Sequence, residues 1–153
     1  MRTIALVLAL PVLVLALGWA APDDRPTDAE RAVEAAVTDY VLGFYEAAPE
    51  RLERCLSTEL KKMGYWLPEE AEEYGGPGHM DYDSALELAA RWNDQGQQGE
   101  DLSYEVEVYE VLDKIASARV SAKWGIDYFH LAKEEGRWKI HHVIWQSHPA
   151  QDS

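Results

Sequence analysis

Two histidines and a tyrosine near the C-terminus are residues of the types that carry general acid–base chemistry. The run Lys133–Arg137 has the composition of a three-residue hairpin loop with a left-handed glycine in a bulge. In that register Tyr128 pairs with His142 and His130 pairs with Ile140, so all four side chains share one face of the hairpin. Because histidine titrates near neutral pH, a substrate held against this face could exchange a proton with either imidazole.

The alternative for these histidines is structural, with both imidazoles filling space and forming hydrogen bonds. A metal site is not expected, because it needs three or four convergent ligands and the consecutive His141 and His142 point to opposite faces of a strand. Cys55 follows helical spacing with Leu52, which predicts a buried, unreactive thiol. We therefore expect no metal and no cofactor, and His130 and His142 are the catalytic candidates only if the protein is an enzyme.

Aromatic side chains could form the walls of a pocket for a flat ligand. Their rings offer large apolar surfaces, and tyrosine hydroxyls or imidazoles can fix the orientation of a bound molecule. The alternative is that the same rings fill the core. The residues predicted to contact a ligand are Tyr45, Trp66, Trp124, Tyr128, His130, Trp138 and His142.

The first element predicted after the N-terminal segment is a long helix. Thr27 and Glu30 match a capping box, in which each residue satisfies the backbone N–H of the other. Apolar residues then recur at spacings of three and four as far as Ala47, which predicts an amphipathic helix with one buried stripe. The stripe consists of Val33, Ala36, Val37, Tyr40, Val41 and Phe44.

Two shorter helices are expected after it. Pro49 suits the first turn of a second helix, and residues 60–66 are predicted to continue it by a further turn or two. Residues 69–78 are acidic and then glycine-rich, which predicts an exposed loop, and their carboxylates lack the alternating spacing of a calcium loop. A third helix is expected from about Asp83 to Trp92.

From residue 102 the hydrophobic period changes from that of a helix to two, which indicates strands. Four strands joined by short turns are predicted, over 102–109, 116–123, 126–133 and 137–146. Helices followed by consecutive strands are typical of an α+β domain in which the helices cover one face of an antiparallel meander sheet.

The composition limits the partners of this protein. The chain has 153 residues, with 14 basic and 28 acidic side chains and a formal net charge of -14. That charge disfavours binding to nucleic acid or to an anionic membrane surface. The single cysteine excludes an intrachain disulfide.

The N-terminus has the pattern of a secretory signal peptide. A basic start, an apolar run and small residues before Ala21 predict a signal peptide over 1–20, with an uncleaved membrane anchor as the alternative. A linker over 21–26, one domain over 27–148 and a tail over 149–153 complete the predicted organisation. We therefore expect a secreted or periplasmic protein, with no membrane attachment after cleavage.

Several segments of this chain resemble a known family. The chain is similar to the putative lumazine-binding proteins of the nuclear transport factor 2-like superfamily. The resemblance implies a cone-shaped α+β fold, in which a curved sheet wraps a long helix around a cavity, and dimerisation through the open face of the sheet. The segments that carry it are Gly43–Glu46, Pro49–Arg54, Met80–Tyr82, Leu88–Ala89, Trp92–Asn93, Asp127–Leu131, Gly136–Ile140 and Trp145.

These observations lead to three functional hypotheses. The first is an exported, non-catalytic protein that binds a small apolar or aromatic ligand in the cone and forms a homodimer. The second is a proton-transfer enzyme, such as an isomerase, cyclase or dehydratase, that uses His130 or His142. The third is a protein-interaction module that acts through the outer face of the sheet.

Overall fold

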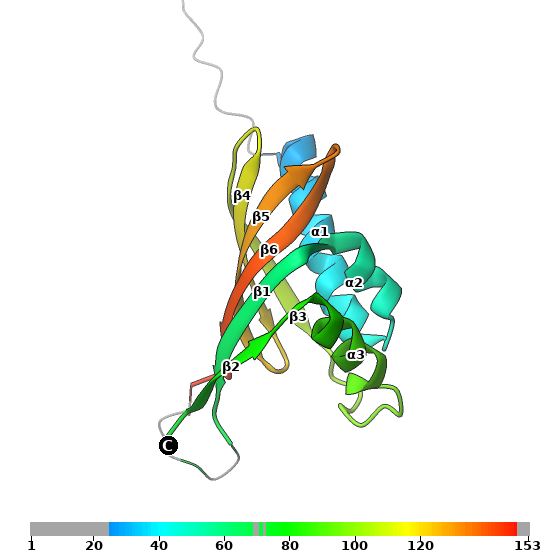
Figure 1. The fold of residues 1–153 in the computed structure, drawn as a ribbon, viewed down its shortest axis with the longest axis vertical. Helices are drawn as coiled ribbons and strands as arrows, with labels where there is room; N and C mark the ends of the chain where they lie inside the picture. The colour runs from blue at the N-terminus through cyan, green and yellow to red at the C-terminus, as the bar shows by residue number, and fades with distance from the viewer. Residues whose placement is uncertain (1–24, 69–70, 72, 150–153) are drawn as a thin grey trace, which may run out of the picture.

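The computed structural model describes residues 25–149 except 69, 70 and 72. The predicted signal peptide 1–20, residues 21–24 of the predicted linker and residues 150–153 of the predicted tail lie outside the described residues. Within the described part of the chain, no helix is both long enough and apolar enough to cross a membrane. The elements are α1 (Asp28–Tyr45), α2 (Pro49–Cys55), β1 (Leu56–Trp66), β2 (Gly75–Met80), α3 (Tyr82–Trp92), β3 (Tyr104–Val111), β4 (Ile115–Ala122), β5 (Gly125–Glu134) and β6 (Arg137–Gln146) (Figure 1).

The strands form one six-stranded mixed sheet in the order β2-β1-β6-β5-β4-β3. β1 and β6 are parallel, and all other neighbouring strands are antiparallel. The sheet is strongly curved, and the three helices lie together on one side of it (Figure 1). The predicted α+β fold with helices packed on a curved sheet is confirmed. The predicted antiparallel meander corresponds to β3–β6, and β1 and β2 extend it into a mixed sheet.

The long helix α1 begins with the predicted capping box. The Thr27 side chain accepts a hydrogen bond from the Glu30 backbone N–H at 3.2 Å, and the Glu30 carboxylate accepts one from the Thr27 backbone N–H at 2.6 Å. Satisfying these two donors fixes the start of the helix. All six residues of the predicted apolar stripe are buried, namely Val33, Ala36, Val37, Tyr40, Val41 and Phe44.

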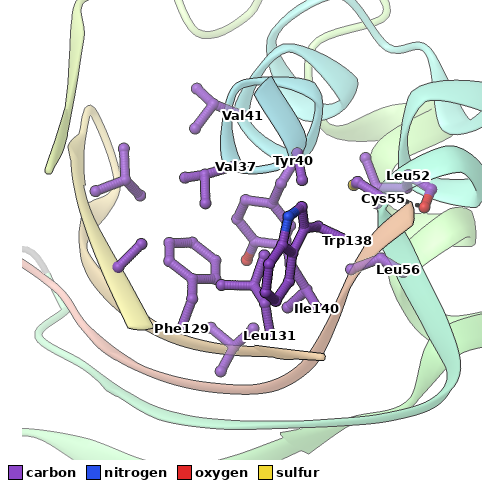
Figure 2. Close-up of a cluster of buried hydrophobic side chains, with 14 of the residues drawn as sticks. Val37, Tyr40, Val41, Leu52, Cys55, Leu56, Phe129, Leu131, Trp138 and Ile140 are labelled. Carbon is purple, nitrogen blue, oxygen red and sulfur yellow. Dashed lines mark hydrogen bonds between the residues drawn. The ribbon is translucent and has the colours of Figure 1, made fainter. Parts of the chain in front are cut away.

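The hydrophobic core lies between α1 and the inner face of β5 and β6 (Figure 2). In Figure 2 the side chains of Phe129, Leu131 and Ile140 point from the curved strands towards α1. Cys55 lies at the edge of this cluster with only 2% of its surface exposed, and burial raises the pKa of its thiol far above the ordinary value. The predicted burial of this thiol is thus confirmed.

Residues 60–66 do not form the predicted helical extension. α2 ends at Cys55, and the chain continues directly as the strand β1. Lys62 pairs with Met80 of β2 on one side and with Val143 of β6 on the other, so the segment lies inside the sheet. Backbone pairing on both edges outweighs the local helical preference of these residues. The end of the predicted 69–78 loop is likewise part of a strand, because β2 begins at Gly75.

The turn between β5 and β6 is one residue shorter than predicted. Glu134 pairs with Arg137, which leaves a two-residue turn. Glu135 and Gly136 both have positive φ, 48° and 82°. Such a turn has the twist of the flanking strands, which is why two-residue hairpin turns of this kind are favoured.

A second register shift follows further along the same hairpin. Leu131 pairs with Ile140, but the preceding His130 pairs with His142, so β6 has one extra residue there. Beyond this bulge Tyr128 pairs with Ile144. The predicted pairings of Tyr128 with His142 and of His130 with Ile140 are therefore wrong, and the two offsets have consequences for the site.

Candidate functional site

A cavity of about 80 Å³ lies between the sheet and the helices α1 and α3. Its walls are mainly apolar and include a single charged side chain. The lining residues come from elements that are far apart in the sequence, so only the tertiary fold brings them together. They are Phe44 of α1, Lys62 of β1, Met80 of β2, Leu88 and Trp92 of α3, Trp124 of the β4–β5 turn and Trp145 of β6.

The aromatic walls of the cavity are held in place by ring-to-ring packing. The Trp124 ring makes edge contacts with Trp92 and Phe44, at centroid distances of 5.3 and 5.6 Å. Trp145 packs directly over Gly64 of β1, where a Cβ atom would lie 2.1 Å from the indole nitrogen. A glycine is therefore needed at this position for the Trp145 ring to form its wall.

Asp127 is the polar centre of the region next to the cavity. This β5 side chain is completely buried, yet both of its carboxylate oxygens have partners. The Trp124 indole N–H donates to Oδ1 at 3.0 Å, and the Tyr40 hydroxyl donates to Oδ2 at 2.7 Å. The Lys62 ammonium lies 3.4 Å from Oδ2. A buried carboxylate needs such a set of donors, because desolvation otherwise makes its charge very costly.

Lys62 connects this carboxylate to the cavity. Its side chain is 7% exposed, and its Nζ donates a short hydrogen bond to the Tyr40 hydroxyl. The same nitrogen lies 5.2 Å from the ring centroids of Tyr40 and Trp145 and 5.7 Å from that of Phe44. Because Phe44 and Trp145 line the cavity, the amine lies among its aromatic walls, where cation–π attraction favours the charged form.

Burial shifts the acid–base properties of this group of residues. It lowers the pKa of Lys62, and the neighbouring Asp127 carboxylate opposes that shift. It raises the pKa of Tyr40 well above the ordinary value, and the Asp127 charge adds to the increase. The Tyr40 hydroxyl therefore stays protonated between an amine and a carboxylate.

The arrangement combines an apolar, ring-lined space with a hydrogen-bond donor in its wall. Such a site suits a planar molecule that carries a hydrogen-bond acceptor. Among the described residues, no group of three histidine, cysteine, aspartate or glutamate side chains is placed to hold a metal ion.

Two of the residues predicted to contact a ligand lie at or beside the cavity. Trp124 lines it. Tyr45 lies behind the wall, with its ring 5.7 Å from Trp92 and 5.4 Å from Trp124. Its hydroxyl donates to the Ser103 carbonyl at 2.8 Å, so Tyr45 supports the wall without being part of it.

The other predicted residues lie elsewhere. Trp138 is buried in the main core, where Figure 2 shows it beside Leu131 and Ile140, and Trp66 is 44% exposed. Tyr128 is 52% exposed, and His130 and His142 are also exposed. Tyr128, His130 and His142, which formed the centre of the predicted pocket wall, thus lie on the outer face of the sheet.

The register explains this misplacement. On β5 the side chains of Asp127, Phe129 and Leu131 point inward, and the alternation of the strand sends Tyr128 and His130 outward. On β6 the bulge at residue 141 changes the inward-facing set, so Ile140 and Val143 are both buried. His142 therefore points outward, although Ile140 is two residues away.

Lys62 and Asp127 were not among the site residues predicted from the sequence. Asp127 lies on the same face of β5 as the buried Phe129 and Leu131. A carboxylate on an otherwise apolar strand face indicates a buried acid that is paired with hydrogen-bond donors. Lys62 alternates with the buried Leu60 and Gly64 in the same way. This alternation was not recognised as a strand pattern, because residues 60–66 were predicted to be helical.

Most of the described part of the chain matches a known protein family. A model of the family described as putative lumazine-binding matches residues 28–146. A search of curated protein sequences gave no match.

Solved structures share the fold at low sequence identity. An NTF-2 like protein of unknown function from Silicibacter pomeroyi DSS-3 is 20% identical with a TM-score of 0.61, covering 76% of this chain and 93% of its own. A ketosteroid isomerase-like protein from Erwinia carotovora atroseptica is 17% identical with a TM-score of 0.53, covering 76% and 94%. A putative scytalone dehydratase from Novosphingobium aromaticivorans is 14% identical with a TM-score of 0.51, covering 80% and 93%. At these identities the likeness concerns the fold alone, and a shared fold does not imply a shared function.

Proposed function

This chain belongs to the putative lumazine-binding family, and from that premise we propose that it binds a small planar molecule in the cavity without chemical turnover. The observation that carries the proposal is the position of the Lys62 amine among aromatic walls. Rings on several sides select a flat apolar body, and the amine selects an acceptor atom on its edge.

The hydrogen-bonding capacity of Lys62 supports this kind of ligand. An ammonium group has three donors, and Tyr40 and Asp127 account for two of them. The described residues provide no further hydrogen-bond acceptor for this nitrogen, so we assign the third donor to a carbonyl or ring nitrogen of a bound molecule. A ligand with such an atom pairs the remaining donor of the buried amine.

The size of the cavity restricts the ligand to a small ring system. An apolar cavity of about 150 Å³ holds benzene, and drug-sized ligands occupy about 300–1,000 Å³. At about 80 Å³ this cavity accepts one ring after a small outward shift of its half-buried side chains Met80 or Leu88. A two-ring molecule such as lumazine requires a larger shift that includes Trp92.

The proton-transfer hypothesis depends on His130 and His142, and neither lines the cavity. His130 and His142 both lie on the outer face, where they border a separate hollow together with Glu110 and Leu112, and none of the residues that line the cavity is a histidine. The cavity itself therefore supports ligand binding and offers no imidazole for proton transfer.

The test is a titration of the full chain with benzamide, lumazine and the acceptor-free ring compound toluene, followed by tryptophan fluorescence and calorimetry. We expect saturable binding with benzamide and lumazine favoured over toluene. Leu88→Phe, which fills the cavity, should weaken benzamide binding at least about tenfold, or ~1.4 kcal/mol. Leu112→Phe is the matched control, because Leu112 is 51% exposed and does not line the cavity. An absence of saturable binding, or equal affinities of the two variants, would contradict the proposal.

The outer face supports a second function, in protein association. Tyr128 and Ile144 are cross-strand partners and are 52% and 54% exposed, which is unusual for large apolar side chains on a strand pair. We propose that this face forms a homodimer interface. Light scattering on the purified chain and on the Tyr128→Ser/Ile144→Ser variant tests it, and a monomeric unmodified chain would contradict it.

We also propose that the protein is exported, on the basis of the apolar run and small residues over 1–20. The measurement is the N-terminal sequence of the protein recovered from the exported fraction of producing cells. A mature N-terminus at Ala21 is expected. A protein that stays in the cytoplasm with its first residues intact would contradict export.

A further inference from the structure

We propose that Lys62 captures a small aldehyde or ketone in the cavity as an imine, so that the ligand is held by a reversible covalent bond. The inference rests on the proposed function, because it takes the cavity as the ligand site and assigns the chemical class of the ligand. The observations behind it are an amine in the wall of an apolar cavity and a hydrogen-bonded route from that amine to a buried carboxylate.

Lys62 differs from the other lysines of the described chain in its surroundings. It is the buried one, whereas its neighbour Lys61 on the same strand is exposed to solvent. A desolvated amine next to aromatic rings loses part of the hydration that stabilises its ammonium form. Burial accordingly lowers the pKa of Lys62. Lysines that form imines are made nucleophilic in the same physical way.

Tyr40 provides a path for the proton that the amine must lose. The Lys62 ammonium donates to the Tyr40 oxygen, and the Tyr40 hydroxyl donates to Asp127 Oδ2 at 2.7 Å. A concerted shift along these two hydrogen bonds moves one proton from the amine to the carboxylate and leaves Tyr40 protonated. The result is a neutral amine and a neutral carboxylic acid, a pair that a dry interior tolerates better than separated charges.

The reaction then balances without any oxidant or reductant. The amine lone pair attacks the carbonyl carbon, a C–N bond forms, and the C=O π electrons move to oxygen. A proton passes from nitrogen to that oxygen and gives a carbinolamine. The proton held by Asp127 returns to the hydroxyl group, which leaves as water while the nitrogen lone pair forms the C=N bond. The products are a cationic iminium and the Asp127 carboxylate, so the net change is ammonium plus carbonyl to iminium plus water.

The surroundings favour this product. The iminium cation stays beside the Asp127 carboxylate and close to the aromatic rings that now surround the ammonium. The apolar walls select a carbonyl compound with one small ring or a short chain. Benzaldehyde meets these requirements and serves as the probe.

The experiment incubates the full chain at pH 7 with benzaldehyde and sodium cyanoborohydride, which reduces an iminium to a stable secondary amine. Peptide mapping by mass spectrometry then compares modification at Lys62 and Lys61 in the same molecules. We expect the modified fraction at Lys62 to exceed that at Lys61 at least tenfold. This comparison within one protein does not depend on whether any variant folds. In Lys61→Met the Lys62 adduct should remain.

Binding of benzamide, which cannot form an imine, separates the two proposals. Benzamide binding together with a Lys62 adduct supports both. Benzamide binding without a Lys62 adduct, or with adducts on exposed lysines alone, overturns the imine and leaves the proposed function standing. If benzamide fails to bind and Lys62 is unmodified, both proposals are overturned.

Discussion

The two faces of β5 and β6 contain titratable residues in opposite situations. On the inner face, Asp127 is fully buried and has three donors from different elements. On the outer face, His130 and His142 are exposed neighbours whose ring centroids lie 6.3 Å apart. The residue types favour the outer face as a site of chemistry, because imidazoles titrate near neutral pH and a carboxylate does not.

The difference in exposure to solvent argues against the outer face as the site of chemistry. Water screens interactions between charged groups on the outer face, whereas groups on the inner face are shielded from solvent. Inside the sheet the pKa of Lys62 is lowered and that of Tyr40 is raised by burial. Burial beside the cavity thus shifts the pKa of two groups that their residue types alone would not single out.

The largest effect is expected for Asp127→Ala. The substitution leaves the Lys62 ammonium, the Tyr40 hydroxyl and the Trp124 indole N–H buried without their shared acceptor. Breaking a buried ion pair on one side costs about 3–5 kcal/mol. Urea unfolding should show a loss of stability in this range. A loss below about 1 kcal/mol would mean that the inner-face network contributes little and that the contrast between the two faces is false.

Tyr40→Phe is expected to have the next largest effect. It removes one hydroxyl and keeps the ring, so Asp127 loses its shortest donor and Lys62 loses an acceptor. The expected loss of stability is about 1–3 kcal/mol, the cost of unsatisfied buried polar groups. Tyr128→Phe is the matched control on the outer face, and unfolding curves of the two variants give the comparison. Equal stabilities would contradict the assigned role of the Tyr40 hydroxyl.

A smaller effect is expected for Lys62, whose contribution to the unfolding free energy should depend on pH. Its folded-state pKa is lowered below the ordinary value of 10.5, so between these two pKa values the unfolded chain binds more protons than the folded chain. Stability must then rise with pH across this window, by at most about 1.4 kcal/mol per pH unit. The difference in unfolding free energy between the unmodified chain and Lys62→Met isolates this contribution, because Tyr40 is present in both. A difference that is constant or falls with pH up to 10.5 would contradict the lowered pKa.

The smallest effect is expected on the outer face. His130→Ala and His142→Ala should each change the unfolding free energy by less than about 0.5 kcal/mol and leave benzamide binding unaltered, since both side chains are exposed and away from the cavity. A tenfold loss of ligand affinity in either variant would show that the outer face takes part in binding, and the comparison of the two faces would have to be reversed.

Much of the fold was predictable from the sequence because its signals are local. The capping box of Thr27 and Glu30 and the apolar stripe of α1 depend on residues within a few positions of each other, and both are confirmed. Val120 and its alternating neighbours on β4 were also predicted correctly, because a strand half-buried in a sheet has period two wherever it lies.

Most of the site was not predictable, for two physical reasons. Residues 60–66 of β1 were predicted to be helical, since their strand structure comes from pairing with β6 and β2 and not from a local pattern. The inward set of β6 depends on a bulge opposite His130 that no local pattern announces. Trp124, which lines the cavity, was among the residues predicted from the sequence, whereas Lys62 and Asp127 were not.

The sequence by itself determined the start of α1, the α+β class and the family, because caps, periodicity and short motifs act through neighbours along the chain. The tertiary structure alone decided which side chains face the cavity. An alternating strand exchanges its faces when its register moves by one residue, and the register of β5 and β6 is set by a turn and a bulge. The meeting of Lys62, Tyr40 and Asp127 is therefore a property of the assembled sheet and helix, since each residue comes from a different element.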